Sequence, residues 1–225
     1  MKGFALVLSI LLCLFGAISA TANKFAKFPL QISFNVTITA HQIEEGSDFP
    51  PRTRKMGIKY DYVNGRAMAY ILPGYEAEKI YIRRYDTQRE YMLRMPPLND
   101  CKRSYLGEIM PYPILSNSKY VHSEEMIDGQ LVDYFLHEDF ETRIHMYFLQ
   151  NTNIPVRLLQ ETFSDGDSAT SGVSVPLLTY DFSEVVLGQP AAEYFELPAP
   201  FVHEQCDRHV GGFPYIHVFH YFVKF

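Results

Sequence analysis

The chain has 225 residues, a formal net charge of −6 and 15% aromatic residues, with 16 Tyr, 17 Phe and no Trp. A mildly acidic chain without a block of Lys or Arg residues is a poor nucleic-acid binder, so no nucleic-acid partner is expected. The length fits one domain, and the aromatic content can fill a large core or line a large apolar cavity.

The first 22 residues have the pattern of a secretory signal peptide. A basic start, Met1-Lys2, precedes an apolar stretch over 4–15, and residues 20–22 (ATA) match a cleavage site. This stretch is too short to cross a membrane, and no later stretch is long enough to do so. We expect cleavage after Ala22. The default destination is then extracellular, as a secreted protein, or the lumen of the secretory-lysosomal (vacuolar) system.

Residues 30–41 (LQISFNVTITAH) alternate strictly between apolar and polar side chains. This period of two is typical of a long β-strand with one buried and one solvated face. Asn35-Val36-Thr37 is an N-glycosylation sequon, and Asn35 lies on the polar face. In a secreted chain we expect a glycan at Asn35, and an unmodified surface asparagine is the alternative.

Further strands with short turns follow this one. Asn64-Gly65 is the strongest short hairpin signal, and Asp128-Gly129 marks a second turn. Pro111 and Pro113 make 105–121 an irregular crossing or a short helix. Eight or nine consecutive strands predict one antiparallel, meandering sheet that curls or closes. The other predicted strands are 56–63, 66–72, 79–86, 89–95, 130–139, 143–150, 156–163 and 175–186.

Two of these predicted strands, 130–139 and 143–150, carry large apolar side chains on both faces. Tyr134, Phe135 and Leu136 are consecutive, as are residues 146–149 (MYFL). A strand that is apolar on both faces is covered on both. One face can belong to the core, while the other can line a ligand cavity or a dimer interface, and core burial on both sides is the alternative.

Signal cleavage would remove Cys13 and leave two cysteines, Cys101 and Cys206. In an oxidising compartment such a pair is most simply one disulfide. His203 and His209 flank Cys206 at a spacing that could suit a metal ion, but a disulfide would remove the thiolate ligand. We therefore expect no metal site here.

Motifs for catalysis are missing from the sequence. It contains no G-x-S-x-G nucleophile elbow, no phosphate-binding glycine loop and no catalytic cysteine context. The acidic residues over 124–141 lack the calcium-loop spacing. We expect a protein without enzymatic activity and without a cofactor, and a hydrolase or metal enzyme is the least favoured hypothesis.

Four stretches carry a resemblance to known proteins: 58–72, 80–93, 126–158 and 180–206. Through them the chain resembles the ependymin-related family and the non-catalytic N-terminal domain of some invertebrate and protist papain-family proteinases. Those proteins are similar to bacterial lipoprotein carriers of the LolA-like fold. The positions that match the pattern are Cys101, Gly129, Tyr134, Pro155, Val156, Arg157, Asp181, Phe182, Phe195, Pro198 and Cys206.

The chain departs from the family pattern in two places. Tyr or Phe stands where a Trp is common after Gly129, and the chain continues past Cys206 into an aromatic tail over 210–225. Because no protease domain follows, catalysis is not inherited from the proteinases. Calcium is implied by the resemblance alone, and no residue is assigned to it.

The resemblance implies a mainly β fold: a single curved, half-open antiparallel β-barrel (LolA-like) over 23–209. A short helical or irregular segment would cross its concave face. Similar proteins hold lipids or other hydrophobic molecules in that concavity. The residues expected to line it here are Tyr134, Leu136, Met146, Phe148, Leu158 and Tyr180.

The favoured hypothesis is a secreted binding protein for a lipid or another hydrophobic small molecule. The alternative is an interaction or matrix protein that acts by homodimerisation or by docking to a protein partner such as a proteinase. The tail over 210–225 could supply the docking surface.

Overall fold

The computed structural model describes residues 26–46, 52–72, 79–115, 117–138, 142–163 and 174–213. The predicted signal peptide (1–22) and all but the first four residues of the predicted tail (210–225) lie outside the described residues. The stretch 164–174, which its Gly, Ser and Asp residues predict to be a loop, also lies outside them except for Ser174.

One large sheet dominates the described part of the chain. Its twelve strands follow the order β14-β7-β6-β5-β4-β3-β2-β13-β12-β11-β10-β9, and all neighbours are antiparallel except β14 and β7. The strands are β2 (Gln31–Ala40), β3 (Thr53–Asp61), β4 (Arg66–Ile71), β5 (Lys79–Arg84), β6 (Arg89–Arg94), β7 (Asp100–Tyr105), β9 (Lys119–Ile127), β10 (Gln130–Glu138), β11 (Thr142–Leu149), β12 (Pro155–Phe163), β13 (Ser174–Leu187) and β14 (Asp207–Arg208).

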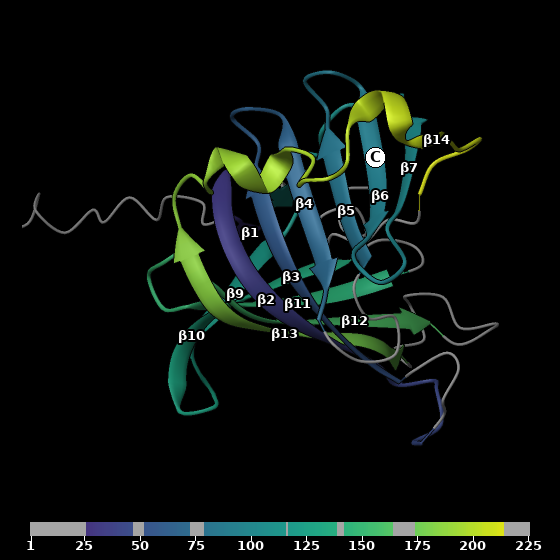
Figure 1. Cartoon of the computed structure of the whole chain (residues 1–225). Coiled ribbons are helices and arrows are strands. Elements are labelled where there is room, and N and C mark those ends of the chain that lie inside the picture. The colour runs from purple at the N-terminus through teal and green to yellow at the C-terminus, as the bar shows by residue number, and fades with distance from the viewer. Residues whose placement is uncertain are drawn as a thin grey trace, which may run out of the picture.

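The sheet curves into an open half-barrel. Figure 1 shows β2 to β7 rising side by side, while β9 to β13 sweep beneath them, so the two groups of strands enclose a concave face. Strands β14 and β9 end the sheet and are not neighbours. This arrangement confirms the predicted fold class, a mainly β chain built on a single curved, half-open antiparallel sheet.

The predicted hairpin turns are present. Strands β3 and β4 pair antiparallel across the turn at Asn64-Gly65, where Gly65 has a φ of +61°. Asp128 and Gly129, with φ values of 49° and 79°, join β9 to β10. Positive φ at both central residues is the geometry of a two-residue hairpin turn. Strands β7 and β9 were not predicted, because their sequences lack a clear apolar alternation.

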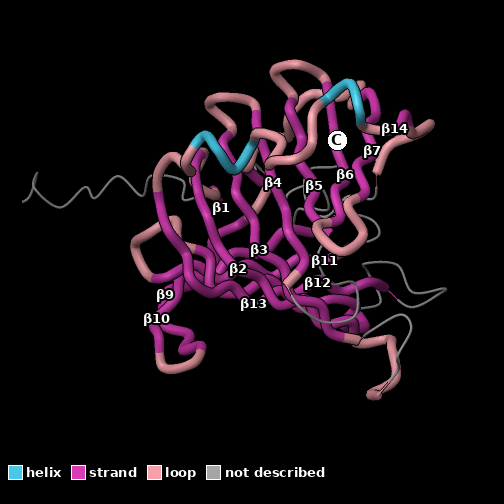
Figure 2. Tube along the Cα trace, in the orientation of Figure 1, coloured by secondary structure: helices cyan, strands magenta, loops and turns pink. Residues whose placement is uncertain are grey.

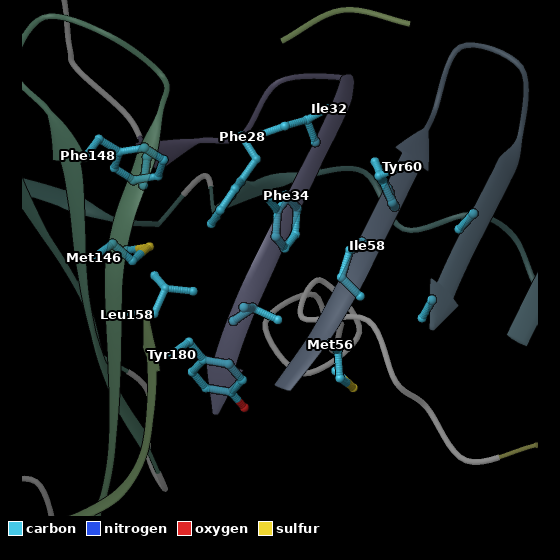
Figure 3. Packing of buried hydrophobic residues seen from close by; sticks show 14 of the residues in the cluster. Phe28, Ile32, Phe34, Met56, Ile58, Tyr60, Met146, Phe148, Leu158 and Tyr180 are labelled. Atoms are coloured by element: carbon cyan, nitrogen blue, oxygen red, sulfur yellow. The ribbon is translucent and has the colours of Figure 1, made fainter. Parts of the chain in front are cut away.

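The concave face carries the main apolar core (Figure 3). Alternation along β2 turns Ile32, Phe34 and Val36 to this face, where each is exposed by 2% or less. Side chains from both halves of the sheet meet them. The other members of this concave cluster are Ala26, Phe28, Met56, Ile58, Tyr60, Ala67, Ala69, Tyr85, Met110, Phe135, Ile144, Met146, Phe148, Leu158 and Tyr180.

Two chain segments outside the large sheet cross the concave face. Strand β1 (Ala26–Lys27) pairs antiparallel with β8 (Ile114–Leu115) in a separate two-stranded sheet. Next to it, the backbone N–H of Phe28 donates to the carbonyl of Pro113 at 3.0 Å. The predicted crossing segment is therefore present, and over 106–118 its described residues contain a short strand and no helix.

The C-terminal segment covers the outer face of β4 to β7. It contains two short 3₁₀ helices, η1 (Ala192–Phe195) and η2 (His203–Gln205), which Figure 2 shows running across the ends of these strands. The structure joins Cys101 on β7 to Cys206 just after η2 in a disulfide, with the two Cα atoms 4.8 Å apart. Beyond it, β14 adds to β7, and Phe213 lies buried against Tyr81 on the opposite face of the sheet.

Candidate functional site

Four of the six residues expected to line a ligand site lie together on the concave face. Met146, Phe148, Leu158 and Tyr180 come from the adjacent strands β11, β12 and β13, and each is exposed by 1% or less. Figure 3 shows them facing the side chains of β2 and β3 across the curve of the sheet. The structure thus brings these four into one apolar surface.

The other two expected lining residues, Tyr134 and Leu136, lie on the outer face of the sheet. On β10 it is Phe135 that joins the concave cluster, with its ring centroid 5.7 Å from that of Phe148. Neighbouring residues of a strand point to opposite faces, so Tyr134 and Leu136 point away from the concave face. Large apolar side chains lie on both faces of β10, so the sequence pattern could not show which face is buried.

Phe28 and Phe34 contribute to the concave surface and were missed by the sequence reasoning. Phe28 packs edge-on against Phe148 at 5.1 Å between ring centroids, and Phe34 packs in the same way against Phe182 at 5.1 Å. The alternation over 30–41 was a usable signal for Phe34. Phe28 lies in a segment outside the large sheet, and no local pattern indicates which surface it contacts.

Tyr60 makes one of the polar contacts between the concave face and the crossing segment. Its side chain is fully buried, and its hydroxyl donates to the backbone carbonyl of Pro111. Burial raises the pKa of Tyr60 well above its ordinary value, with smaller effects from Tyr85 and Tyr62. The hydroxyl is therefore neutral and its hydrogen is available for this bond.

A polar and aromatic group occupies the outer face of β10 to β13. The Tyr134 hydroxyl lies 2.8 Å from Nδ1 of His145, whose Nε2 lies 3.3 Å from the Glu161 carboxylate. Ser174 Oγ donates to the same carboxylate at 2.5 Å. Burial acts to raise the pKa of Glu161, but the hydrogen bonds from Ser174 and His145 and the charge of Arg143 hold it below its ordinary value.

His203, Cys206 and His209, whose spacing could suit a metal ion, each contact a different partner. Cys206 is in the disulfide, His203 Nδ1 lies 2.8 Å from the Tyr91 hydroxyl, and His209 stacks on Phe213 at 4.9 Å between ring centroids. Over the described part of the chain, no group of three or more His, Cys, Asp or Glu side chains is placed to hold a metal ion. Among the same residues, no helix is both long and apolar enough to cross a membrane.

Comparisons with known proteins give structural likenesses only. No protein-family model and no curated protein matches the chain. It is similar to MucB in the crystal structure with MucA(peri), at 12% identity and a TM-score of 0.41, over 75% of this chain and 54% of that one. The Pseudomonas aeruginosa MucA/MucB complex gives 13% identity and a TM-score of 0.43, over 75% of this chain and 56% of that one.

An uncharacterized conserved protein from Thermus thermophilus is similar at 12% identity and a TM-score of 0.47, over 79% of this chain and 90% of that one. The chain spans about half the length of the MucB chains it matches. At such low identities and TM-scores, neither family membership nor activity follows. The ependymin-related and papain-family parts of the sequence resemblance therefore stay predictions.

Proposed function

We propose that the chain is a secreted, non-enzymatic binding protein that holds a lipid or another hydrophobic small molecule against its concave face. The observation that supports this most is the concave cluster, which draws apolar side chains from both halves of the sheet. Among the described residues, two narrow segments cover it, one around β1 and one over 106–118, and they pair with each other only in the short two-stranded sheet of β1 and β8.

The concave cluster is packed with its own side chains, so a ligand must take the place of the covering segments. The contacts that hold these segments include three hydrogen bonds: Phe28 N–H to Pro113, Ala26 N–H to the Ser118 hydroxyl at 2.9 Å, and Tyr60 to Pro111. A ligand chain that replaces Phe28 against the sheet gains about 0.8 kcal/mol for each CH₂ group it buries. Movement of the covering segments is therefore the step that admits the ligand.

The first experiment asks whether the protein carries an apolar ligand. The chain is expressed in a eukaryotic secretory host, purified without detergent, extracted with organic solvent and analysed by mass spectrometry. A stoichiometric amount of one lipid class is the expected result. Its absence, together with no fluorescence gain of a hydrophobic probe on the purified protein, would contradict the proposal.

A pair of variants locates the site. Phe28→Ala removes a ring from the covering segment and opens apolar space beside Phe148, so probe binding should increase. Leu136→Ala removes a similar apolar side chain from the outer face and should leave probe binding unchanged. Equal effects of the two variants would place the ligand elsewhere.

A second candidate function is self-association through the edge strand β9. This strand ends the sheet, and Val121 and Met126 on it are 46% and 56% exposed, next to Leu131 on β10 at 46%. An edge strand with exposed apolar side chains can pair with the same strand of a second copy around a two-fold axis. Val121→Lys should then convert a dimer into a monomer in sedimentation. A monomeric unmodified chain would exclude this candidate.

A further inference from the structure

The outer face of β2, β3 and β4 carries an ordered set of side chains around Asn35. In the cross-strand register, Asn35 faces Gly57 and Gly57 faces Tyr70. The Asn35 side chain is half-buried, and its Nδ2 donates to the Glu184 carboxylate at 2.7 Å. Its Oδ1 lies 3.4 Å from the Tyr70 hydroxyl.

The Tyr70 ring lies over Gly57 and reaches toward Asn35. A Cβ atom added at Gly57 would overlap ring atoms Cζ and Cε1 and the hydroxyl oxygen of Tyr70. Glycine is therefore the residue that lets this ring lie against the sheet next to Asn35. Tyr70 is half-buried, so part of its ring remains open to solvent beside the asparagine amide.

Two further groups surround this position. Tyr194 on η1 is 41% exposed, and the Lys59 ammonium lies 5.0 Å from the centre of its ring. Glu184 has a φ of 51° and lies where the pairing of β13 with β2 shifts register, so a local irregularity of β13 brings its carboxylate to Asn35. Asn35 thus lies beside an aromatic ring, with hydrogen-bonding and charged groups nearby.

We propose that Asn35 carries an N-linked glycan whose first sugar lies on the Tyr70 ring. The apolar face of a pyranose packs on an aromatic ring, while its hydroxyl groups bond to neighbouring polar side chains such as Glu184. The proposal rests on the predicted entry into the secretory pathway. It is independent of what the concave face binds, because Asn35 lies on the opposite face of the sheet.

The chemistry leaves the observed contacts of Asn35 in place. Nδ2 forms a bond to C1 of the sugar and loses one proton. The C1–oxygen bond of a lipid-diphosphate-linked oligosaccharide breaks, and the lipid diphosphate leaves. The modified amide keeps one N–H, which can still donate to Glu184, and keeps Oδ1 next to the Tyr70 hydroxyl.

Occupancy is tested by mass. Asn35-Val36-Thr37 is the single N-x-S/T sequon in the sequence. Any mass that an N-glycan-removing enzyme takes from the protein therefore comes from a glycan at Asn35. Protein secreted from a eukaryotic host should lose this mass on enzymatic deglycosylation. Thr37→Ser should keep the glycan, and Thr37→Val and Asn35→Gln should lack it. Secreted, signal-cleaved protein without a glycan would overturn the proposal.

The position of the sugar is tested by comparing the melting temperature of the glycosylated protein with that of the same chain produced without N-glycosylation, so that residue 35 remains Asn in both. The glycosylated unmodified chain should melt about 1–3 °C higher, the shift expected for a contact of modest strength in a domain of this size. Tyr70→Phe should keep this difference because it keeps the ring, and Tyr70→Ala should abolish it. The same difference in Tyr70→Ala would show that the sugar does not lie on Tyr70.

Discussion

Arg83 and Glu90 face each other on β5 and β6 and form a buried ion pair, with Nη2 and Oε2 3.3 Å apart and side-chain exposures of 6% and 2%. The backbone of Phe213 joins this pair. Its carbonyl accepts from Arg83 at 3.2 Å and its N–H donates to Glu90 at 2.9 Å. The last described residue of the chain is therefore held on the concave side of the sheet by charged groups.

Glu90→Gln should change how stability depends on pH. Burial raises the pKa of Glu90 above its ordinary value of 4.5, against the opposing effects of the Phe213 hydrogen bond and the Arg83 charge. The native carboxyl holds its proton more tightly than the unfolded one. Its contribution to the free energy of unfolding is therefore complete below pH 4.5 and is lost as pH rises through the native pKa.

Glutamine does not titrate, so the stability of Glu90→Gln relative to the unmodified chain should rise with pH. Urea unfolding of both proteins at a series of pH values, from below 4.5 up to neutral pH, measures this. Glu196→Gln removes a carboxylate from the ion pair with Arg84 on the outer surface and serves as the control. If the stability of Glu90→Gln relative to the unmodified chain fell with rising pH, the raised pKa of Glu90 would be contradicted.

Asp61→Ala should destabilise the fold by about 2–4 kcal/mol, because it removes a buried carboxylate that organises the first hairpin. Asp61 is fully buried and accepts from Gln31, Arg66 and Asn64, each at 2.8 Å. Asp86→Ala, in a partly exposed pair with Arg84, should cost about 1 kcal/mol or less. If thermal or urea unfolding showed similar losses of stability for Asp61→Ala and Asp86→Ala, Asp61 would not be the carboxylate that organises the first hairpin.

The same carboxylate has its own pH dependence. Burial acts to raise the pKa of Asp61, but the hydrogen bonds from Gln31, Arg66 and Asn64 leave it below its ordinary value of 3.8. Its stabilising contribution is therefore present above pH 3.8 and is lost as pH falls through the native pKa. Asp61→Asn should lose less stability than the unmodified chain does when the pH is lowered through this range.

Reduction of the Cys101–Cys206 disulfide should lower the free energy of unfolding by about 2–5 kcal/mol, because the bond closes a long loop in the unfolded chain. The two cysteines are 105 residues apart in sequence. The measurement compares urea unfolding of the oxidised chain with that of the Cys101→Ala/Cys206→Ala variant. Thiol titration of the denatured, unreduced, signal-cleaved protein should find no free thiol, and two free thiols would refute the bond.

Leu158→Ala should cost about 2–5 kcal/mol, since Leu158 is completely buried in the concave cluster. Leu136→Ala, on the outer face of β10, should cost less because that side chain is half-buried. The pair tests which face of the sheet forms the core. A larger loss for Leu136 would reverse the assignment of the two faces.

Several features could be predicted because local chemistry is sufficient to produce them. The alternation over 30–41 places Phe34 inside and Asn35 outside in any sheet with one buried face, since adjacent side chains point in opposite directions. Asn64-Gly65 forms a hairpin because glycine adopts positive φ without steric cost. The pairing of Cys101 with Cys206 followed from their number once Cys13 was assigned to the signal peptide.

Arg83 shows where local reasoning fails. Alternation correctly separates it from Arg84, which binds Asp86 and Glu196 on the outer face. An arginine on a hairpin lies by default at the surface, but the structure buries Arg83. Its burial depends on Glu90, Glu108 and Phe213, and the last of these is far away in sequence.

The strands with clear alternation, their turns and the disulfide were predictable from the sequence, because each depends on neighbouring residues or on the number of cysteines. Which face of β10 is buried, by contrast, follows from the folding of the whole sheet. Large apolar side chains lie on both faces of that strand. The curvature of the sheet turns Phe135, and not Tyr134 or Leu136, into the concave cluster. The same curvature brings Phe28 and the 106–118 segment against Phe148 and Tyr60, and such contacts depend on long-range packing that no local pattern encodes.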